Sequence, residues 1–284
     1  MRPPRYWHRH WVDLTPLEGD SSAWRIPHWG WSSNSQEEAV ELALARTKRS
    51  VISWSVMTRD ANSAIDEDWY DVMDYLVTPP REEVLHEVLA QDGSASHWVS
   101  RNRYGAEILN TRNLAIIDVD RPASFDRFQA DTLAEANSEM EQLLISACEA
   151  LERYGFRIYR TFAGWRLIIT SHVFDGVTDE SIMVMTKFPT DDLYRKLCVR
   201  HKCYRARLSP KPWRIGCERF NTTYPYDRAD LPRITQWIRG YYTASKGFRT
   251  AELIYDDGQT ASDLEPIIAL HDSACCINLE LPLA

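Results

Sequence analysis

The amino-acid sequence predicts an α+β protein built on an antiparallel sheet of the RRM or palm type, with helices packed on one face and an irregular Trp-rich N-terminal extension. Three observations predict this class. Residues 114–120 are an apolar run that ends in acids, which is typical of a buried strand. Residues 131–153 repeat apolar residues at helical spacing. Residues 156–171 hold two alternating segments joined by Ala163-Gly164, which indicates a β-hairpin.

Length and charge bound the organisation of the chain. It has 284 residues, 44% of them hydrophobic, and a formal net charge of −8. This is enough for one large domain or two small ones. We expect residues 1–100 to form a Trp-rich helical extension and residues 101–284 to form the α+β core, unless the two make one continuous domain. The net charge excludes a uniformly basic nucleic-acid coat but not a local basic groove.

The cysteines and the apolar runs predict a cellular location. The six cysteines include no C-x-x-C pair, and residues 1–11 lack the apolar segment of a secretory signal. No apolar run reaches the roughly 20 residues that a membrane span needs. We therefore expect a soluble cytoplasmic protein with reduced thiols and no membrane contact.

The N-terminal hundred residues predict mostly helices. Residues 1–34 hold five tryptophans without a clear period and are expected to be irregular. Residues 37–49 follow a candidate N-cap at Ser35 and are expected to be helical, with a short strand at 51–56. Two further helices are expected, over residues 66–76 and 81–89.

The remaining residues predict a split β-α-β arrangement. Strands are expected at 107–109 and 114–118, before the long helix and the hairpin. A helix is expected at 191–200 and a strand at 252–257.

Asp118 and Asp120 are the first candidate site. Side chains alternate along a strand, so both carboxylates point to one face, about 7 Å apart. Such a pair can hold Mg²⁺ or Mn²⁺, as phosphoryl-transfer enzymes do. The alternative is that the strand simply ends there and Asp120-Arg121-Pro122 is a turn.

The hairpin supplies two candidate phosphate ligands. Arg160 precedes the turn and Arg166 follows it, and we expect them to face one another and the two aspartates. Their charge suits a triphosphate or a nucleic-acid backbone. The alternative is an ordinary solvated sheet face.

Residues 195–219 are strongly basic in an acidic chain. They contain nine Lys and Arg residues against the single acid Glu218, with aromatic residues between them. Basic groups neutralise phosphates and aromatic rings stack on bases, so this segment predicts nucleotide or nucleic-acid contact. The alternative is a salt-bridged surface. The candidate ligands are Arg205, Arg207, Lys211, Trp213 and Arg214.

The same segment raises the question of zinc. Cys198, His201, Cys203 and Cys217 have a spacing that departs from paired zinc knuckles. Buried free thiols are the favoured interpretation.

The strand with D-x-D, the long helix and the hairpin together resemble the palm core of archaeo-eukaryotic primases and primase-polymerases. The resemblance covers residues 105–260. Asp118 and Asp120 match the first motif of that family. Arg166 stands where its second motif carries a His, with His172 six residues later, and Asp256 is a candidate for the third acid. The resemblance implies nucleotidyl transfer with Mg²⁺ or Mn²⁺ held by Asp118, Asp120 and Asp256.

Three functions follow from these patterns. The leading one is metal-dependent nucleotidyl or phosphoryl transfer on nucleotides or nucleic acid. The second is a non-catalytic nucleic-acid or nucleotide-binding protein in which Asp118 and Asp120 are structural. The third is a protein-interaction scaffold that uses the tryptophans.

Overall fold

The computed structural model describes residues 2–14, 24–57, 79–90, 92–121, 132–220 and 222–284. The chain divides into two compact units, residues 1–79 and 80–284. The boundary expected near residue 100 lies inside the second unit, because residues 83–101 form strands that pair with later ones. The helix expected over residues 66–76 falls outside the described residues.

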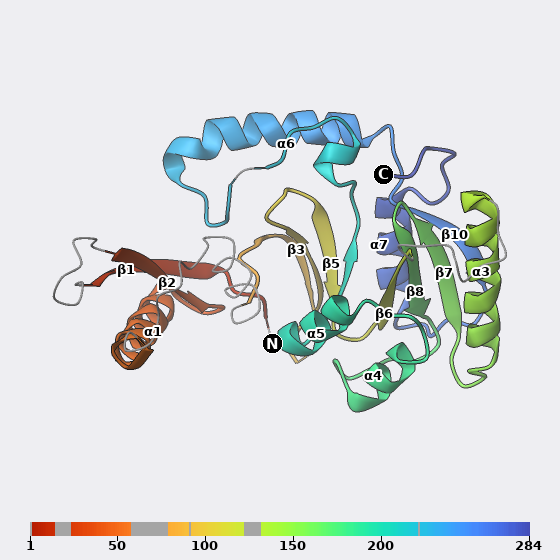
Figure 1. Cartoon of the computed structure of the whole chain (residues 1–284), viewed down its shortest axis with the longest axis horizontal. Coiled ribbons are helices and arrows are strands. Elements are labelled where there is room, and N and C mark those ends of the chain that lie inside the picture. Colours follow the sequence, from red (N-terminus) through yellow and green to blue (C-terminus); the bar gives the residue numbers. More distant parts are fainter. Residues whose placement is uncertain (1, 15–23, 58–78, 91, 122–131, 221) are drawn as a thin grey trace. The chain divides into compact units, whose positions relative to one another are not determined.

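The first unit contains an antiparallel hairpin and one helix (Figure 1). β1 (Tyr6–Leu14) pairs with β2 (Trp24–Ser32) in continuous register, and α1 (Gln36–Met57) follows. The prediction of an irregular extension is wrong for these residues. Trp29 and Trp31 lie opposite Arg9 and Trp7 across the hairpin. Their separation of two positions is the sequence signal of a strand.

Helix α1 packs directly on the hairpin backbone. A Cβ added to Gly30 would lie 2.0 Å from the carbonyl oxygen of Ala39 and 2.4 Å from the nitrogen of Ala43, so only glycine permits this approach. The strand predicted at residues 51–56 is wrong, because α1 continues through them. Extending an existing helix adds a hydrogen bond per residue, which outweighs the β propensity of Val and Ile.

The first sheet of the second unit contains the D-x-D strand. β10 (Ala251–Asp256), β7 (Phe156–Thr161), β8 (Gly164–Ile169) and β6 (Ile116–Asp120) lie in that order, and all neighbours are antiparallel. β6 and β7 are therefore parallel to one another with β8 between them. Together with α3 (Leu133–Glu149) they form the split β-α-β unit that the sequence predicts.

Two helices lie on opposite faces of this sheet. α3 contacts Trp165 and Arg160 through Glu141, whereas α7 (Glu265–Cys275) contacts Tyr159 through Asp272 and Arg166 through His271. The α+β class with antiparallel sheets is confirmed, with the refinement that helices cover both faces. A Thr132–Glu135 capping box begins α3.

The second sheet has the order β3 (Glu83–Leu89), β4 (Ala95–Arg101), β5 (Glu107–Thr111) and β9 (Tyr204–Arg207), again antiparallel throughout. The helix predicted over residues 81–89 is wrong, since this segment is β3. Its register shifts twice along β4. Such irregularities break the two-residue alternation that identifies a strand in a sequence.

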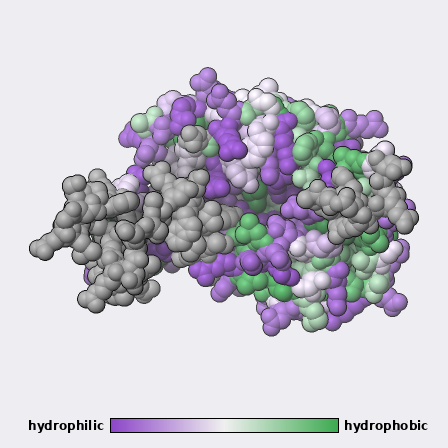
Figure 2. Space-filling view, in the orientation of Figure 1, coloured by the Kyte–Doolittle hydropathy of each residue, from purple (hydrophilic) through white to green (hydrophobic). Residues whose placement is uncertain are grey.

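The remaining elements frame the two sheets. They are α4 (Asp179–Met185), α5 (Asp192–His201), the short 3₁₀ turns η1 (Pro212–Arg214) and η2 (Arg228–Asp230), and α6 (Leu231–Ser245). On the visible face of the second unit, hydrophilic residues predominate along α6 (Figure 2). Among the described residues, no helix has the length and apolar character needed to cross a bilayer.

One residue of α5 joins the two sheets. The Tyr194 hydroxyl lies 3.0 Å from the Ile116 carbonyl oxygen on β6 and 3.1 Å from the Arg205 carbonyl oxygen on β9. β6 and β9 are thus held beside one another, and each carries candidate site residues.

Candidate functional site

Strand β6 presents its acids on one face and its apolar side chains on the other. Ile117 and Val119 are buried, whereas Asp118 is partly buried and Asp120 is exposed. The alternation follows from the strand geometry, as the sequence predicts. The main chain is fixed at this point, because the amide of Asp191 donates to the Asp118 carbonyl oxygen at 3.0 Å.

Arg166 of β8 lies directly opposite Asp118 in the strand register. Its side chain is only 4% exposed. Nη1 donates to the carbonyl oxygen of Arg207 at 3.1 Å and lies 3.0 Å from Nε2 of His271. The hairpin therefore places one fixed guanidinium beside Asp118.

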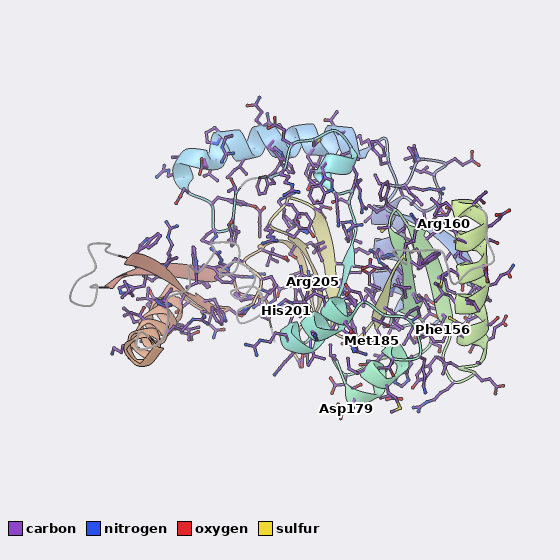
Figure 3. The ribbon with its side chains drawn as sticks, in the orientation of Figure 1. Phe156, Arg160, Asp179, Met185, His201 and Arg205 are labelled. Atoms are coloured by element: carbon purple, nitrogen blue, oxygen red, sulfur yellow. The ribbon has the colours of Figure 1, made fainter. Side chains whose placement is uncertain are left out.

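Arg160 lies on the other face of the same sheet. It is opposite Trp165, not Arg166, in the register. Its guanidinium forms two 2.7 Å bonds to Glu141 and one of 3.1 Å to Glu252. Figure 3 shows Arg160 beside α3. The expectation that Arg160 and Arg166 face one another is wrong, because the two-residue turn gives the two positions opposite orientations.

The basic segment supplies three more cations near β6. Arg207 ends β9, Lys211 directly precedes the η1 turn, and Arg214 is the last residue of that turn. The Tyr241 hydroxyl of α6 donates to the Pro210 carbonyl oxygen at 2.6 Å and lies 2.7 Å from the Ser209 hydroxyl oxygen. The segment that carries Lys211 is thus anchored at its start.

These residues form a group that we call the β6 charge cluster. Its members act on one another electrostatically. They are Asp118, Asp120, Asp191, Arg166, Arg207, Lys211 and Arg214.

The acids of the β6 charge cluster are partly desolvated. Burial raises the pKa of Asp118, against the opposing charges of Arg166 and Arg207. Burial also raises the pKa of Asp120, with a further contribution from the charge of Asp191. Their ionised forms are therefore less stable here than in water.

The cations are desolvated as well. Burial lowers the pKa of Arg207, helped by the charge of Arg166. Burial and the charge of Arg207 also lower the pKa of Lys211, and lower that of Arg214 to about 10. Cations and acids thus share one partly buried region.

Donors and acceptors of this cluster are left unpaired. Throughout the described part of the chain, the carboxylates of Asp118 and Asp120 have no hydrogen-bond or ion-pair partner. The buried Nε of Arg166, Nε of Arg207 and Nη1 of Arg214 also have no acceptor there. Buried polar groups are ordinarily paired, so a set of unpaired ones requires an explanation.

Two other predicted site residues are placed elsewhere. Arg205 forms an ion pair of 2.6 Å with the buried Glu82 of the second sheet. Asp256 bonds Arg157 at 2.8 Å on β10, three strands and about 14 Å across the sheet from β6. The structure therefore brings Asp118 and Asp120 together but separates Asp256 from them.

The carboxylates of β6 are the candidate metal ligands. Within the ranges that the structure describes, no three His, Cys, Asp or Glu residues are grouped to hold a metal. All six cysteines are free, with Cys198 and Cys203 buried as the sequence predicts. Two unpaired carboxylates still fit Mg²⁺ or Mn²⁺, because Mg²⁺ usually keeps waters and takes one or two carboxylates plus substrate phosphates.

Trp213 presents an aromatic surface next to this cluster. Its side chain is 43% exposed, and Tyr104 meets it edge-on with ring centroids 5.4 Å apart. Lys211 Nζ and Arg219 Cζ lie 5.6 and 5.0 Å from the Trp213 ring centroid. An aromatic face flanked by cations suits a nucleobase and its phosphate.

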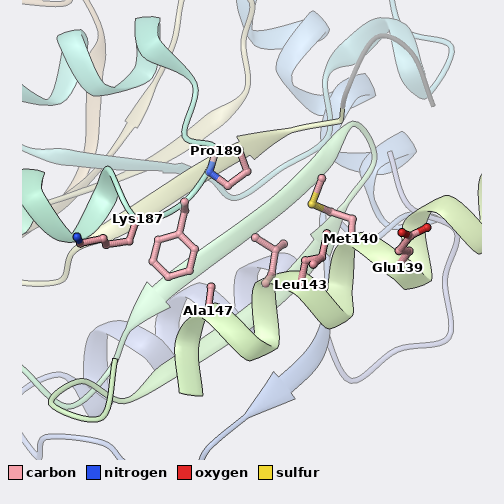
Figure 4. A pocket seen from close by; sticks show the side chains of 8 residues that line it. Glu139, Met140, Leu143, Ala147, Lys187 and Pro189 are labelled. Atoms are coloured by element: carbon pink, nitrogen blue, oxygen red, sulfur yellow. The ribbon is translucent and has the colours of Figure 1, made fainter. Parts of the chain in front are cut away.

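An apolar pocket of about 310 Å³ lies apart from these residues, between α3 and residues 187–189 (Figure 4). Met140, Leu143 and Ala147 line it from α3, and Phe188 lies opposite. It contains none of the β6 charge cluster.

Sequence reasoning missed Asp191, His271 and Cys275 as neighbours of the site. Asp191 is the N-cap of α5, where its Oδ1 accepts from the Leu193 amide at 2.8 Å. Thr190-Asp191-Asp192 is a recognisable helix start, but only the fold places it beside β6.

Comparison of the chain with protein-family models, curated proteins and solved structures found no match. The functional argument therefore depends on the geometry of the β6 charge cluster.

Proposed function

We propose that the β6 charge cluster binds the phosphate groups of a nucleotide or nucleic acid and supports metal-dependent nucleotidyl or phosphoryl transfer. The observation that supports this proposal is the set of unpaired buried donors on Arg166, Arg207 and Arg214. Leaving a buried donor without an acceptor costs about 1–3 kcal/mol. A phosphate oxygen is an acceptor that suits a guanidinium fork.

The two carboxylates would hold the metal. Asp118 and Asp120 have free oxygen atoms on one strand face, and the phosphates of the substrate would complete the coordination. A bound Mg²⁺ or Mn²⁺ would supply charge stabilisation to the phosphoryl oxygens. Arg166 and Arg207 would neutralise further phosphate charge, and Lys211 would bind beside Asp120. The sequence pattern of D-x-D strand, long helix and hairpin, which resembles that of the primase palm, supports the same proposal.

Thermal unfolding of the full chain tests this. We would measure the melting temperature with MnCl₂ alone, ATP alone and both together. A ligand of the folded state raises that temperature by mass action. We expect ATP to stabilise the protein and Mn²⁺ to increase the effect. Absence of any stabilisation by ATP, with or without metal, contradicts the proposal.

Two variants and a matched control locate the binding site. Arg207→Met is expected to abolish stabilisation by ATP, and Asp118→Asn to abolish only the increment from Mn²⁺. Arg160→Ala removes a guanidinium from the same hairpin on the opposite face and should leave both effects intact. Equal losses in Arg160→Ala and Arg207→Met would show that the β6 charge cluster is not the site.

Catalysis requires its own measurement. Mixed nucleoside triphosphates and a primed single-stranded template, with Mn²⁺, should give labelled product that Asp118→Asn reduces by about a hundredfold or more. A wild-type protein that binds ATP but yields no product would restrict the function to binding.

Trp213 favours a second candidate function, a non-catalytic single-stranded nucleic-acid-binding protein. Its exposed ring between Lys211 and Arg219 is a stacking surface whether or not a metal binds. Salt-sensitive binding that is lost in Trp213→Ala and unchanged by Mg²⁺ and by Asp118→Asn would favour this candidate.

A further inference from the structure

The surface of α3 contains an exposed leucine beside an apolar pocket. Leu143 lies within this helix, and 56% of its side chain is exposed. The same residue forms part of the wall of the pocket of about 310 Å³ between α3 and residues 187–189. An apolar cavity of about 150 Å³ accepts a benzene molecule, so this pocket has room for a leucine side chain. A projecting leucine and a space that can hold one therefore lie next to each other.

The floor of the pocket belongs to the hydrophobic core of the second unit. Met140, Leu144 and Phe188 line the pocket, and all three are buried members of that core. Covering apolar surface of this kind stabilises a complex by about 25 cal/mol per Å² removed from water. The pocket therefore favours an apolar occupant.

The exposed positions of α3 around Leu143 carry no charge. From residue 140 to residue 148, the exposed residues are Gln142, Leu143 and Ser146. The acid in this stretch, Glu141, is only partly exposed and bonds Arg160 at 2.7 Å. In the whole chain, 26% of the residues are charged, so their absence here is distinctive. Depletion of charged residues is the compositional sign of the centre of a protein interface.

The two ends of the pocket carry opposite charges. Figure 4 shows Glu139 at one end and Lys187 at the other, with the apolar residues between them. Within the described part of the chain, neither of these two side chains has an ion-pair partner. A rotation by 180° about an axis through the middle of such a surface exchanges its ends, so that each acid then meets a lysine.

We propose that this surface, which we call the α3 face, is the interface of a two-fold symmetric dimer of this chain. It consists of Glu139, Met140, Leu143, Ala147, Lys187 and Phe188. In the dimer, the leucine of each protomer enters the pocket of the other, and the acid of each protomer lies against the lysine of the other. A two-fold interface requires a surface that is complementary to itself, and the α3 face meets this requirement in shape and in charge.

The α3 face is distinct from the β6 charge cluster. α3 contacts Trp165 on one face of the sheet, whereas Arg166 bonds His271 of α7 on the other. The proposed dimer therefore does not depend on what the cluster binds, and either proposal can fail without the other.

Sedimentation velocity of the full chain over a range of concentrations tests the proposal. We expect a dimer with a dissociation constant in the micromolar range or below, as specific interfaces have. Leu143→Asp places a charge at the apolar centre of the interface and should weaken the dimer by about a hundredfold or more. Leu279→Asp is the matched control, because Leu279 is similarly exposed, at 52%, and lies outside the α3 face. It should leave the dimer unchanged.

A pair of charge variants tests the two-fold geometry. Glu139→Lys makes both ends of the α3 face positive, and Lys187→Glu makes both ends negative. Each variant alone should therefore dimerise about ten times more weakly than the parent protein, because like charges meet. In an equimolar mixture, one protomer of each kind restores both pairs of opposite charges. We expect this heterodimer to be about as stable as the parent dimer.

The outcomes that contradict the proposal are specific. A parent protein that stays monomeric up to about 100 μM overturns it, and the pocket would then be left to a small ligand or to another protein. A dimer that Leu143→Asp does not weaken also overturns it, because the interface then lies elsewhere. Circular dichroism verifies that Leu143→Asp is folded. If it is not, the charge variants decide, and a mixture that dimerises no better than its components refutes the two-fold arrangement.

Discussion

Asp118 and Arg166 are cross-strand neighbours on β6 and β8, yet Arg166 donates Nη1 to the carbonyl oxygen of Arg207 and not to the aspartate. The arginine is thus positioned by the protein main chain and by His271. Its charge still opposes the rise in the pKa of Asp118. The carboxylate and the guanidinium are thus adjacent but not bonded to one another. The contacts of this site and of the sheets around it lead to four predictions.

Asp118→Asn should stabilise the protein at neutral pH. The folded-state pKa of Asp118 is raised above its unfolded value, so its contribution to stability is present at low pH and lost as pH rises through the folded pKa. Asparagine cannot ionise, so the variant does not lose this stability as pH rises. Its melting temperature at neutral pH should exceed that of the parent protein by a few degrees. Thermal unfolding of both proteins from about pH 4 to about pH 8 measures this. Asp256→Asn breaks an ion pair with Arg157 and should not raise stability.

Arg207→Met should change stability and binding in opposite directions. Arg207 carries a partly buried charge, and its buried Nε has no hydrogen-bond acceptor among the described residues. Burying this group therefore costs free energy that the folded protein does not recover. Methionine should therefore raise the melting temperature without ligand by a few degrees, while ATP no longer raises it. The two proteins are compared in the same thermal assay. A variant that is less stable without ATP would show that Arg207 has a structural role.

Glu82→Gln should be strongly destabilising. The Glu82 and Arg205 side chains are 8% and 11% exposed and form an ion pair, and Glu82 also accepts from the Ser100 hydroxyl at 2.5 Å. Removing one partner of a buried pair costs about 3–5 kcal/mol. Urea unfolding measures this loss. Replacing both Glu82 and Arg205 by methionine should cost less than Glu82→Gln alone, and a larger cost would refute the argument.

Gly164→Ala should disturb the end of β6. A Cβ at Gly164 would lie 2.1 Å from the carbonyl oxygen of Val119, next to Asp120. The strands must then move apart, at a cost of about 1–3 kcal/mol. Gly240→Ala in α6 is the control, because no atom lies within 4 Å of its added Cβ and alanine favours a helix by about 0.5–1 kcal/mol. Chemical denaturation of both variants should give opposite signs.

The sequence predicts the strand and helix order of residues 107–169 well. These elements have regular alternation or a helical repeat and are bounded by turns. The hairpin turn is Phe162-Ala163, one position before the Ala163-Gly164 turn that the sequence predicts, because Gly164 already pairs with Thr161. The facing of Asp118 and Asp120 follows from alternation alone. The orientation of Arg160 could also have been predicted from the sequence. The register across a two-residue turn directs the Arg160 side chain to the same face of the sheet as Trp165.

Other features depend on contacts that a single sequence does not reveal. β3 has the apolar spacing of a helix, and only its pairing with β4 makes it a strand. Asp191 and His271 reach the site through the tertiary fold. The role of Arg205 depends on Glu82, which lies more than a hundred positions earlier in the chain. Charge pairing of this kind has no local signature.

The Tyr194 hydroxyl, which touches main-chain atoms of both β6 and β9, has a consequence for ligand recognition. The spacing between the acids of one sheet and Arg207 of the other is set before any molecule arrives. In the function that we propose, a phosphate group would have to fit this preset spacing, so ligands would be selected by their size.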